Sequence, residues 1–247
     1  MTIKRVLLQV RLAVSFLTIV PVRTTDADGS DVAASMAWFP LIGLLLGVAL
    51  ALEDHLLAAL LPHATRSALI VLSLTLVTGA LHLDGLADTA DALGAGRDRD
   101  RALEILRDSR IGAFGAIALF FALALKLISI ETVFGRARIA TLILAPMLSR
   151  WSMVAVSYQF DYLRTSGAGS AMLGRGAARN LGVASILALA VMLPLHSGRI
   201  FEAYGVTIVA TLAMRRFYRR RFGGITGDLI GACGEIVEVL AMIALGS

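Results

Sequence analysis

Three regularly spaced aspartates give the clearest chemical signal in this chain. Asp84, Asp88 and Asp91 come directly after a long apolar run and stand at positions i, i+4 and i+7. If this stretch is helical, the three carboxylates share one face of the helix, where like charges repel. A divalent cation between them relieves the repulsion, and carboxylate oxygens suit Mg²⁺ or Mn²⁺. The spacing therefore predicts a metal site at these aspartates.

A second acidic set lies near the end of the chain. Asp228 opens the last apolar segment, and Glu235 and Glu238 lie inside it. Asp228 and Glu235 are seven residues apart, so they project from one side of a helix. Acidic groups within an apolar span usually face a partner or a wet cavity. Arg150 is the most obvious counter-charge, so a structural ion pair between Arg150 and Glu235 stays open beside a role in the site.

Glycines and arginines near both acidic sets are typical of a phosphate site. The glycine-rich stretch 223–227 precedes a helix start, and Gly112 and Gly115 follow Arg110. Backbone N–H groups at such places can bind phosphate, and guanidinium groups bind its oxygens in pairs. Each signal also has a plainer explanation, because glycines serve helix packing and the basic run 215–221 serves membrane topology.

The remaining reactive side chains offer no nucleophilic chemistry. His82 precedes Asp84 by two residues and lies on a different helical face, where a metal ligand, a proton carrier and a hydrogen-bonding residue all stay open. The single cysteine, Cys233, lies in an apolar span, and no histidine has an evident nucleophile beside it. Catalysis through a Ser/His/Asp or a Cys/His arrangement therefore has no support.

Composition places the chain in a bilayer. Hydrophobic residues make up 57%, charged residues only 17%, and the mean hydropathy is +0.80. A soluble domain is normally about a quarter charged. The net charge of +5 comes mostly from arginines between apolar runs. This pattern matches the positive-inside bias of membrane proteins, and we expect no nucleic-acid partner.

The apolar pattern predicts an all-α, polytopic transmembrane helix bundle of six or seven spans, formed as one domain by residues 1–247. Residues 5–20 predict an N-terminal interfacial helix, and the polar stretch Thr24 to Asp31 predicts a loop. The apolar segments are 33–52, 66–83, 112–130, 139–157, 181–195, 202–214 and 228–246. The segments 181–195 and 202–214 leave open a tilted pair or a re-entrant pair.

The loop arginines predict an orientation. With seven spans, the basic loops 84–111, 158–180 and 215–227 fall on the same side as the basic start of the chain. The opposite side carries fewer basic residues. The positive-inside rule then places the carboxylates and basic loops at the cytoplasmic face. Enzymes commonly bind a diphosphate substrate with Mg²⁺ and arginine side chains. The carboxylates and loop arginines at this face therefore predict a membrane phosphotransferase.

The string from His82 to Asp91, His-Leu-Asp-Gly-Leu-Ala-Asp-Thr-Ala-Asp, resembles the signature of the cobalamin synthase family, the adenosylcobinamide-GDP ribazoletransferases. The likeness extends, in the family's order and spacing, to further stretches of the chain. These stretches are 16–21, 39–43, 107–112 and 224–232. One departure is Ala92, where the family pattern has glycine after the third aspartate; it removes no ligand.

The resemblance implies a Mg²⁺-dependent phosphoryl transfer. α-Ribazole, free or as its 5′-phosphate, attacks the phosphate on the adenosylcobinamide side of adenosylcobinamide-GDP. GMP leaves, and adenosylcobalamin or its 5′-phosphate forms in the last assembly step. The family is placed in the bacterial inner membrane as a multi-pass protein. A homo-oligomer, or association with other enzymes of cobamide assembly, stays open.

The resemblance also suggests roles for individual residues. Asp84, Asp88 and Asp91 are expected to hold Mg²⁺, and one of them to act as the base, with Asp108 as a fourth candidate ligand. The expected substrate-binding residues are His82, Arg107, Arg110, Thr226, Asp228 and Glu235. The two arginines would grip the diphosphate, and the last two acids would complete the site or position the ribazole.

Two rival classes follow from the same residues. Other Mg²⁺-dependent membrane transferases, such as CDP-alcohol phosphotransferases and prenyl-diphosphate transferases, also use aspartate-rich motifs at the membrane surface. Their characteristic spacings are absent around 84–91. An ion-coupled transporter would carry acidic residues at the midplane. Most acidic residues here lie at span ends and in charged loops.

Overall fold

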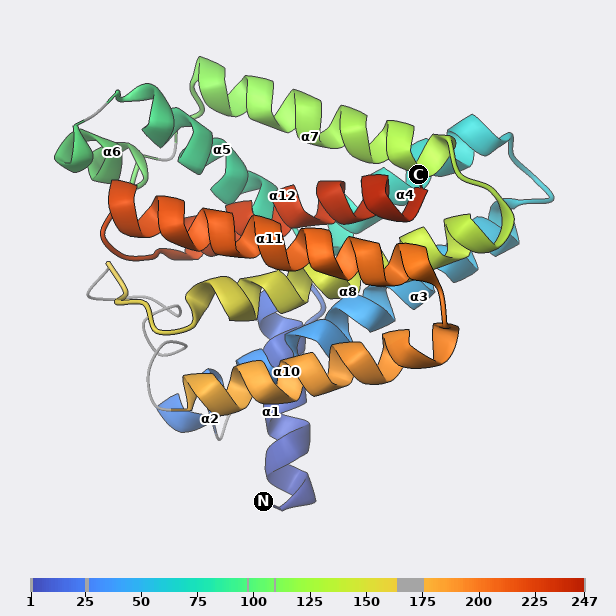
Figure 1. Ribbon diagram of the computed structural model, residues 1–247, viewed down its shortest axis with the longest axis horizontal. Helices are drawn as coiled ribbons and strands as arrows, with labels where there is room; N and C mark the ends of the chain where they lie inside the picture. Colours follow the sequence, from blue (N-terminus) through green and yellow to red (C-terminus); the bar gives the residue numbers. More distant parts are fainter. Residues whose placement is uncertain (1, 25–26, 97, 109, 164–175, 247) are drawn as a thin grey trace.

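The computed structural model describes residues 2–24, 27–96, 98–108, 110–163 and 176–246. Over these residues the regular structure is helical, with one isolated bridge between Tyr162 and Ile225, which confirms the all-α prediction. The longer helices run side by side as a bundle (Figure 1). The helices are α1 (Ile3–Leu17), α2 (Gly29–Ser35), η1 (Met36–Trp38), α3 (Phe39–Leu57), α4 (His63–Val77), α5 (Leu81–Gly94), α6 (Arg99–Ile105), α7 (Ala113–Glu131), α8 (Gly135–Ser157), α10 (Ala177–Met192), η2 (Leu193–Leu195), α11 (Gly198–Arg221) and α12 (Gly227–Gly246).

The helix α8 is the centre of the bundle and contacts α3, α10, α11 and α12. Its side chains Leu144, Met147 and Leu148 are buried. Glycines on α3 allow the two helices to come close, since a Cβ at Gly47 would lie only 2.6 Å from the Cα of Ile143. Small residues at such crossings are the usual means of packing helices within a bilayer.

Five helices are long and apolar enough to cross a membrane, and the count reaches six if the bent pair α4 and α5 is one span. The expected segment 202–214 lies within α11, which does not meet this test. Arg199 and Glu202 at one end of α11 and the run of arginines at the other shorten its apolar part. α10 and α11 nevertheless form a full antiparallel hairpin in the bundle, not a re-entrant loop (Figure 1).

The expected apolar segment 66–83 is two helices. α4 ends at Val77, and α5 begins at Leu81 at an angle of 87° to it. Gly79 and Ala80 make the turn with φ values of 60° and 54°. The signature aspartates therefore lie on a separate helix set steeply across the preceding one.

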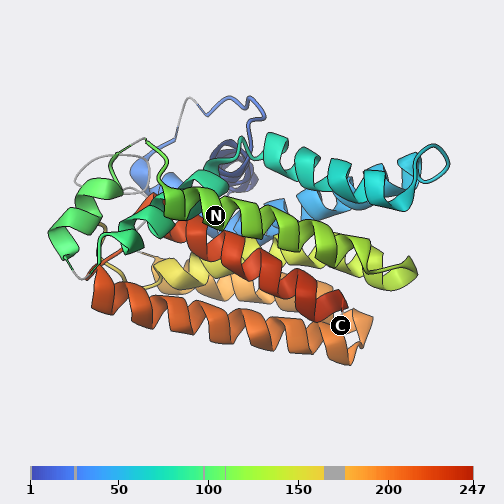
Figure 2. The same ribbon diagram turned by 90° about the horizontal axis from the view of Figure 1, so that it is seen from above.

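The N-terminal helix α1 lies across the bundle axis, where it contacts α2 and α3 (Figures 1 and 2). This is the orientation expected of a helix in the plane of a membrane surface. The prediction of a loop as far as Asp31 is wrong at its end, because α2 begins at Gly29. The Asp28 carboxylate caps α2 by accepting hydrogen bonds from the N–H groups of Ser30 and Asp31.

The described parts of the basic loops gather at one end of the bundle, as the sequence predicted (Figure 1). Arg221 at the end of α11 donates to the carbonyl of Gly96 at 2.6 Å, and Tyr162 pairs with Ile225. The turns between α3 and α4, α7 and α8, and α10 and α11 lie at the other end. Part of the expected loop 158–180, residues 164–175, lies outside the described residues.

Candidate functional site

The helices α5 and α12 cross at two glycines. A Cβ at Gly85 would lie 2.8 Å from the Cα of Asp228, and one at Gly231 would lie 3.2 Å from the Cα of His82. Larger residues at either position would hold the helices apart. The crossing brings Asp228, more than a hundred residues away in the chain, beside the signature aspartates, whereas Glu235 and Glu238 lie deeper within the bundle.

The three signature aspartates project from α5 with different exposure. Asp84 is exposed, and Asp88 and Asp91 are half-buried. One oxygen of Asp91 accepts a hydrogen bond from the N–H of Gly112 at 2.7 Å, and the other accepts from Gly115 at 2.9 Å. Asp91 thus caps the start of α7, where the helix dipole favours a negative charge.

The cap changes the expected use of Gly112 and Gly115. Their N–H groups were candidates for binding phosphate, but they bind the Asp91 carboxylate. A side chain at Gly115 would collide with the same carboxylate, so close approach requires glycine. Asp91 keeps further lone pairs on both oxygens, and its role as a metal ligand stays a prediction.

The described residues include no group of three or more His, Cys, Asp or Glu side chains placed to hold a metal ion. The carboxylates of α5 share a helical face without converging on one point. Mg²⁺ is compatible with such a face, because it commonly binds one or two carboxylates and takes water and substrate phosphates as its other ligands. The donor chemistry therefore fits Mg²⁺, and Mg²⁺ itself stays a prediction.

Thr226 lies at the start of α12 and is buried there. Its hydroxyl accepts a hydrogen bond from the N–H of Leu229 at 3.3 Å and donates one to Asp228 at 3.3 Å. Thr226 therefore caps α12 and helps to orient Asp228. Contact between Thr226 or Asp228 and a substrate stays a prediction.

The loop before α7 carries an exposed ion pair. Arg110 donates to both oxygens of Asp108, with Nη2 at 2.7 Å from Oδ2 and Nε at 3.0 Å from Oδ1. These hydrogen bonds lower the pKa of the Asp108 carboxyl below its ordinary value. Arg107 is exposed. The next residue of this motif, Ser109, lies outside the described residues.

A buried group of four charges lies within the bundle. Lys126 of α7 donates to Glu235 and to Glu238 of α12, both at 2.6 Å, and Glu238 also pairs with Arg150 of α8. The sequence left open an ion pair between Arg150 and Glu235. Arg150 does form a buried ion pair, but its partner is Glu238. Lys126 was missed, although one cation in an otherwise apolar span was a signal that a partner is needed.

His82 is buried on the inward face of α5, away from the exposed Asp84. Its Nδ1 has no hydrogen-bond partner among the described residues and no contact with solvent. The different faces of His82 and Asp84 agree with the helical prediction. Substrate binding by His82 stays a prediction.

Arginines of the basic run in α11 donate hydrogen bonds to backbone carbonyls at the ends of neighbouring helices. Arg215 donates to the carbonyls of Ala155 and Val156 at the end of α8, at 2.8 and 2.9 Å. Its guanidinium also lies 5.1 Å from the ring centre of Phe160, a cation–π contact. Arg221 donates to the carbonyls that precede α6. These contacts give part of the basic run a structural role in addition to any effect on topology.

The spans and the charged residues at one end of the bundle define a polytopic membrane protein with a polar site at its rim. The chain belongs to the Cobalamin-5-phosphate synthase family, whose sequence model matches residues 9–246. This result confirms the resemblance in the signature and separates the chain from the rival transferases and transporters.

Curated relatives cover nearly the whole chain. Proteins named adenosylcobinamide-GDP ribazoletransferase are 36% identical in Desulforamulus reducens and 37% identical in Geotalea daltonii. The matches cover 96% and 95% of this chain and the same shares of the relatives. A protein of the same name from Escherichia coli strain K12 is 38% identical over 94% of this chain and 96% of its own. The search of solved structures found no match.

Proposed function

We propose that this chain is a membrane transferase that joins adenosylcobinamide-GDP to α-ribazole, or to its 5′-phosphate, with release of GMP. The α5–α12 crossing carries the proposal, because it sets the signature aspartates beside Asp228 at one end of the bundle. Family membership and whole-length relatives of that name support it. The substrates are small molecules, and the enzyme works in a membrane.

The reaction breaks one phosphoanhydride bond. A ribazole hydroxyl oxygen forms a new bond to the phosphorus on the corrinoid side, and the bridging oxygen leaves with GMP. The hydroxyl proton passes to a carboxylate, for which exposed Asp84 and half-buried Asp88 are the candidates. Asp91 is less suited to this task, because both of its oxygens bind backbone N–H groups.

Asp84 and Asp88 would hold Mg²⁺, with Asp91 and Asp108 as further candidate ligands. Bound Mg²⁺ supplies charge neutralisation at the transferred phosphoryl group and the leaving group. Arg107 and Arg110 would bind the diphosphate from the loop that Asp91 anchors at Gly112. Glu235 would act from inside the bundle through its ion pair with Lys126, and not by direct contact with the ribazole.

We place the aspartate end at the cytoplasmic face of a bacterial inner membrane. The basic loops at this end support the orientation through the positive-inside rule. The matched relatives named above are bacterial proteins. The substrates are polar, so a site at the end of the bundle spares them from entering the bilayer.

The direct test is incubation of the purified protein with adenosylcobinamide-GDP and α-ribazole. GMP release and formation of a corrinoid product should occur together, in equal amounts, and only when both substrates are present. GMP release without α-ribazole would indicate a hydrolase. The absence of product with either form of ribazole, in protein that remains folded, would refute the proposed reaction.

A further inference from the structure

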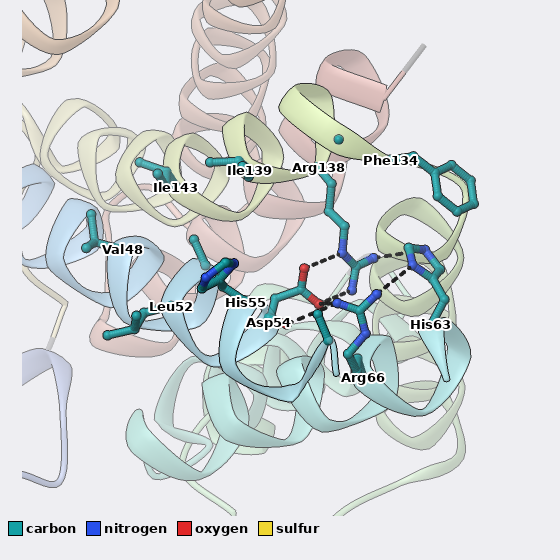
Figure 3. Close-up of a pocket in the computed structure, with 13 residues that line it drawn as sticks. Val48, Leu52, Asp54, His55, His63, Arg66, Phe134, Arg138, Ile139 and Ile143 are labelled. Atoms are coloured by element: carbon teal, nitrogen blue, oxygen red, sulfur yellow. Dashed lines mark hydrogen bonds and ion pairs between the residues drawn. The ribbon is translucent and has the colours of Figure 1, made fainter. Parts of the chain in front are cut away.

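A pocket of about 480 Å³ lies at the end of the bundle opposite the aspartates, between α3, α4 and α8 (Figure 3). Asp54, His55 and Arg66 line its polar part, together with Arg138. The proposed reaction uses none of these residues. The pocket therefore needs an explanation of its own.

Two guanidinium groups share one carboxylate in this pocket. Arg138 donates to both oxygens of Asp54, at 2.8 and 2.9 Å, and Arg66 donates to Oδ1 of the same residue at 2.9 Å. The Arg138 side chain is only 4% exposed and that of Arg66 14%. Burying charges is expensive unless each is compensated, and one carboxylate compensates only one of the two cations.

Among the residues that line this pocket, Asp54 is the only carboxylate beside the two guanidinium groups. Glu131 approaches the ring of His63 at 3.8 Å but does not line the pocket. The Nε of Arg66 is closed to solvent, and its Nη1 donates to Asp54, so the donor left for a ligand is Nη2, which has one N–H beyond its contact with His63 at 3.3 Å. His55 is exposed in the last turn of α3, and no hydrogen bond of its side chain is present in the described part of the chain. The polar part of the pocket thus offers positive charge and N–H donors to an anion.

The rest of the pocket is apolar and opens sideways. Val48 and Leu52 of α3 face Ile139 and Ile143 of α8 across it (Figure 3). Leu52 is 55% exposed and Ile139 51%. Both helices are long and apolar enough to cross a membrane, so these side chains face acyl chains. The pocket therefore has a basic polar part above apolar walls. This combination matches a lipid with an anionic head group and acyl chains.

We propose that this pocket binds an anionic glycerophospholipid. Its phosphate accepts hydrogen bonds from Arg66 and His55, while buried Arg138 contributes positive potential. One acyl chain lies against Leu52 and Ile139. A free phosphate ion would leave the apolar walls without a partner, so the tail is part of what the pocket recognises. The proposal does not depend on the proposed reaction.

The test is a lipid titration of the full-length, delipidated protein in detergent, read by native mass spectrometry. Dioleoylphosphatidylglycerol should bind more tightly than dioleoylphosphatidylcholine, and sn-glycerol 3-phosphate should not bind at the same concentrations. Arg66→Met should weaken binding of the anionic lipid about fivefold. The matched control is Arg136→Met, because Arg136 is exposed in the first turn of α8 and does not line the pocket.

Equal binding of the two lipids would overturn the proposal, as would an Arg66→Met protein that binds phosphatidylglycerol like the unchanged protein. Binding of sn-glycerol 3-phosphate as tightly as the lipid would overturn the lipid as occupant. If Arg66→Met does not fold, Leu52→Ser and Ile139→Ser decide the matter. Both exposed positions tolerate serine, and unchanged lipid affinity in both variants would overturn the proposal.

Discussion

Asp91 shows how one carboxylate of a regular motif acquires a different task from its neighbours. Asp84, Asp88 and Asp91 have the same chemistry and share one face of α5, and the hydrogen bonds of Asp91 reach the start of α7. There it replaces the missing hydrogen-bond acceptors of the first helical turn. The motif thus combines the exposed Asp84 with an acid that fixes the neighbouring loop.

Replacing Asp91 measures what its cap of α7 contributes to stability. Asp91→Ala removes both acceptors at α7, and it should lower the free energy of unfolding by about 1–2 kcal/mol. Unfolding of the purified protein in detergent measures the effect. The control is Asp100→Ala, since Asp100 is exposed in the first turn of α6. Equal stability of the Asp91→Ala and Asp100→Ala proteins would show that the cap contributes nothing.

The helices α7, α8 and α12 are joined through the buried charges of Lys126, Arg150, Glu235 and Glu238. Two cations meet two carboxylates, so the group is balanced as long as all four are present. Removing one member leaves an uncompensated charge in a medium of low polarity. This group therefore holds the elements together only as a complete set.

Lys126→Met tests that dependence. The single variant should lose about 3–5 kcal/mol of stability, because two carboxylates are left with one cation. Adding Glu235→Gln removes the unpaired charge and should restore a large part of the loss. Thermal unfolding of the single and double variants gives the comparison. A double variant less stable than Lys126→Met alone would contradict the charge-balance explanation.

The crossing of α5 and α12 depends on glycine. Gly85→Leu should force the helices apart, with a stability loss of about 1–3 kcal/mol and a marked loss of GMP release. Gly182→Leu is the matched control, because a Cβ at Gly182 in α10 meets nothing within 4 Å. Parallel assays of activity and unfolding compare the two. If both variants kept full activity, the close crossing would not be needed for the reaction.

Two polar regions lie at opposite ends of the molecule. The aspartates and basic loops lie at one end, and the Asp54 pocket lies at the other. The proposed reaction site and the proposed lipid pocket are thereby separated by the length of the bundle. On the positive-inside rule, we propose that the first end faces the cytoplasm.

Cysteine labelling tests this orientation. Cys233 is buried, so new cysteines at exposed Asp100 and exposed Ala64 can be labelled against little background. A membrane-impermeant maleimide should label Ala64→Cys in spheroplasts and Asp100→Cys only in inverted vesicles. Labelling of both positions from one side would contradict the arrangement of the spans.

The sequence could predict the helical bundle because a bilayer offers no hydrogen-bond partners to the backbone. Only helices and closed barrels satisfy all of their backbone groups internally, so long apolar segments predict helices. It did not predict the turn at 78–80, since the apolar run continues to Leu83 without proline. The cap by Asp91 depends on a helix that begins more than twenty residues later. The pairing of Lys126 depends on which faces of α7 and α12 meet, and periodicity alone does not determine this.

We propose that exposed Asp84 and half-buried Asp88 of α5 hold a divalent cation against the diphosphate of the substrate. The decisive measurement is a Mg²⁺ titration of GMP release, in which Asp84→Asn is compared with Asp100→Asn. Asp84→Asn should lower the maximal rate about a hundredfold to a thousandfold and shift the titration to higher Mg²⁺, while Asp100→Asn should leave both unchanged. GMP release at the full rate without any divalent cation, or an Asp84→Asn protein with an unaltered titration, would contradict the claim.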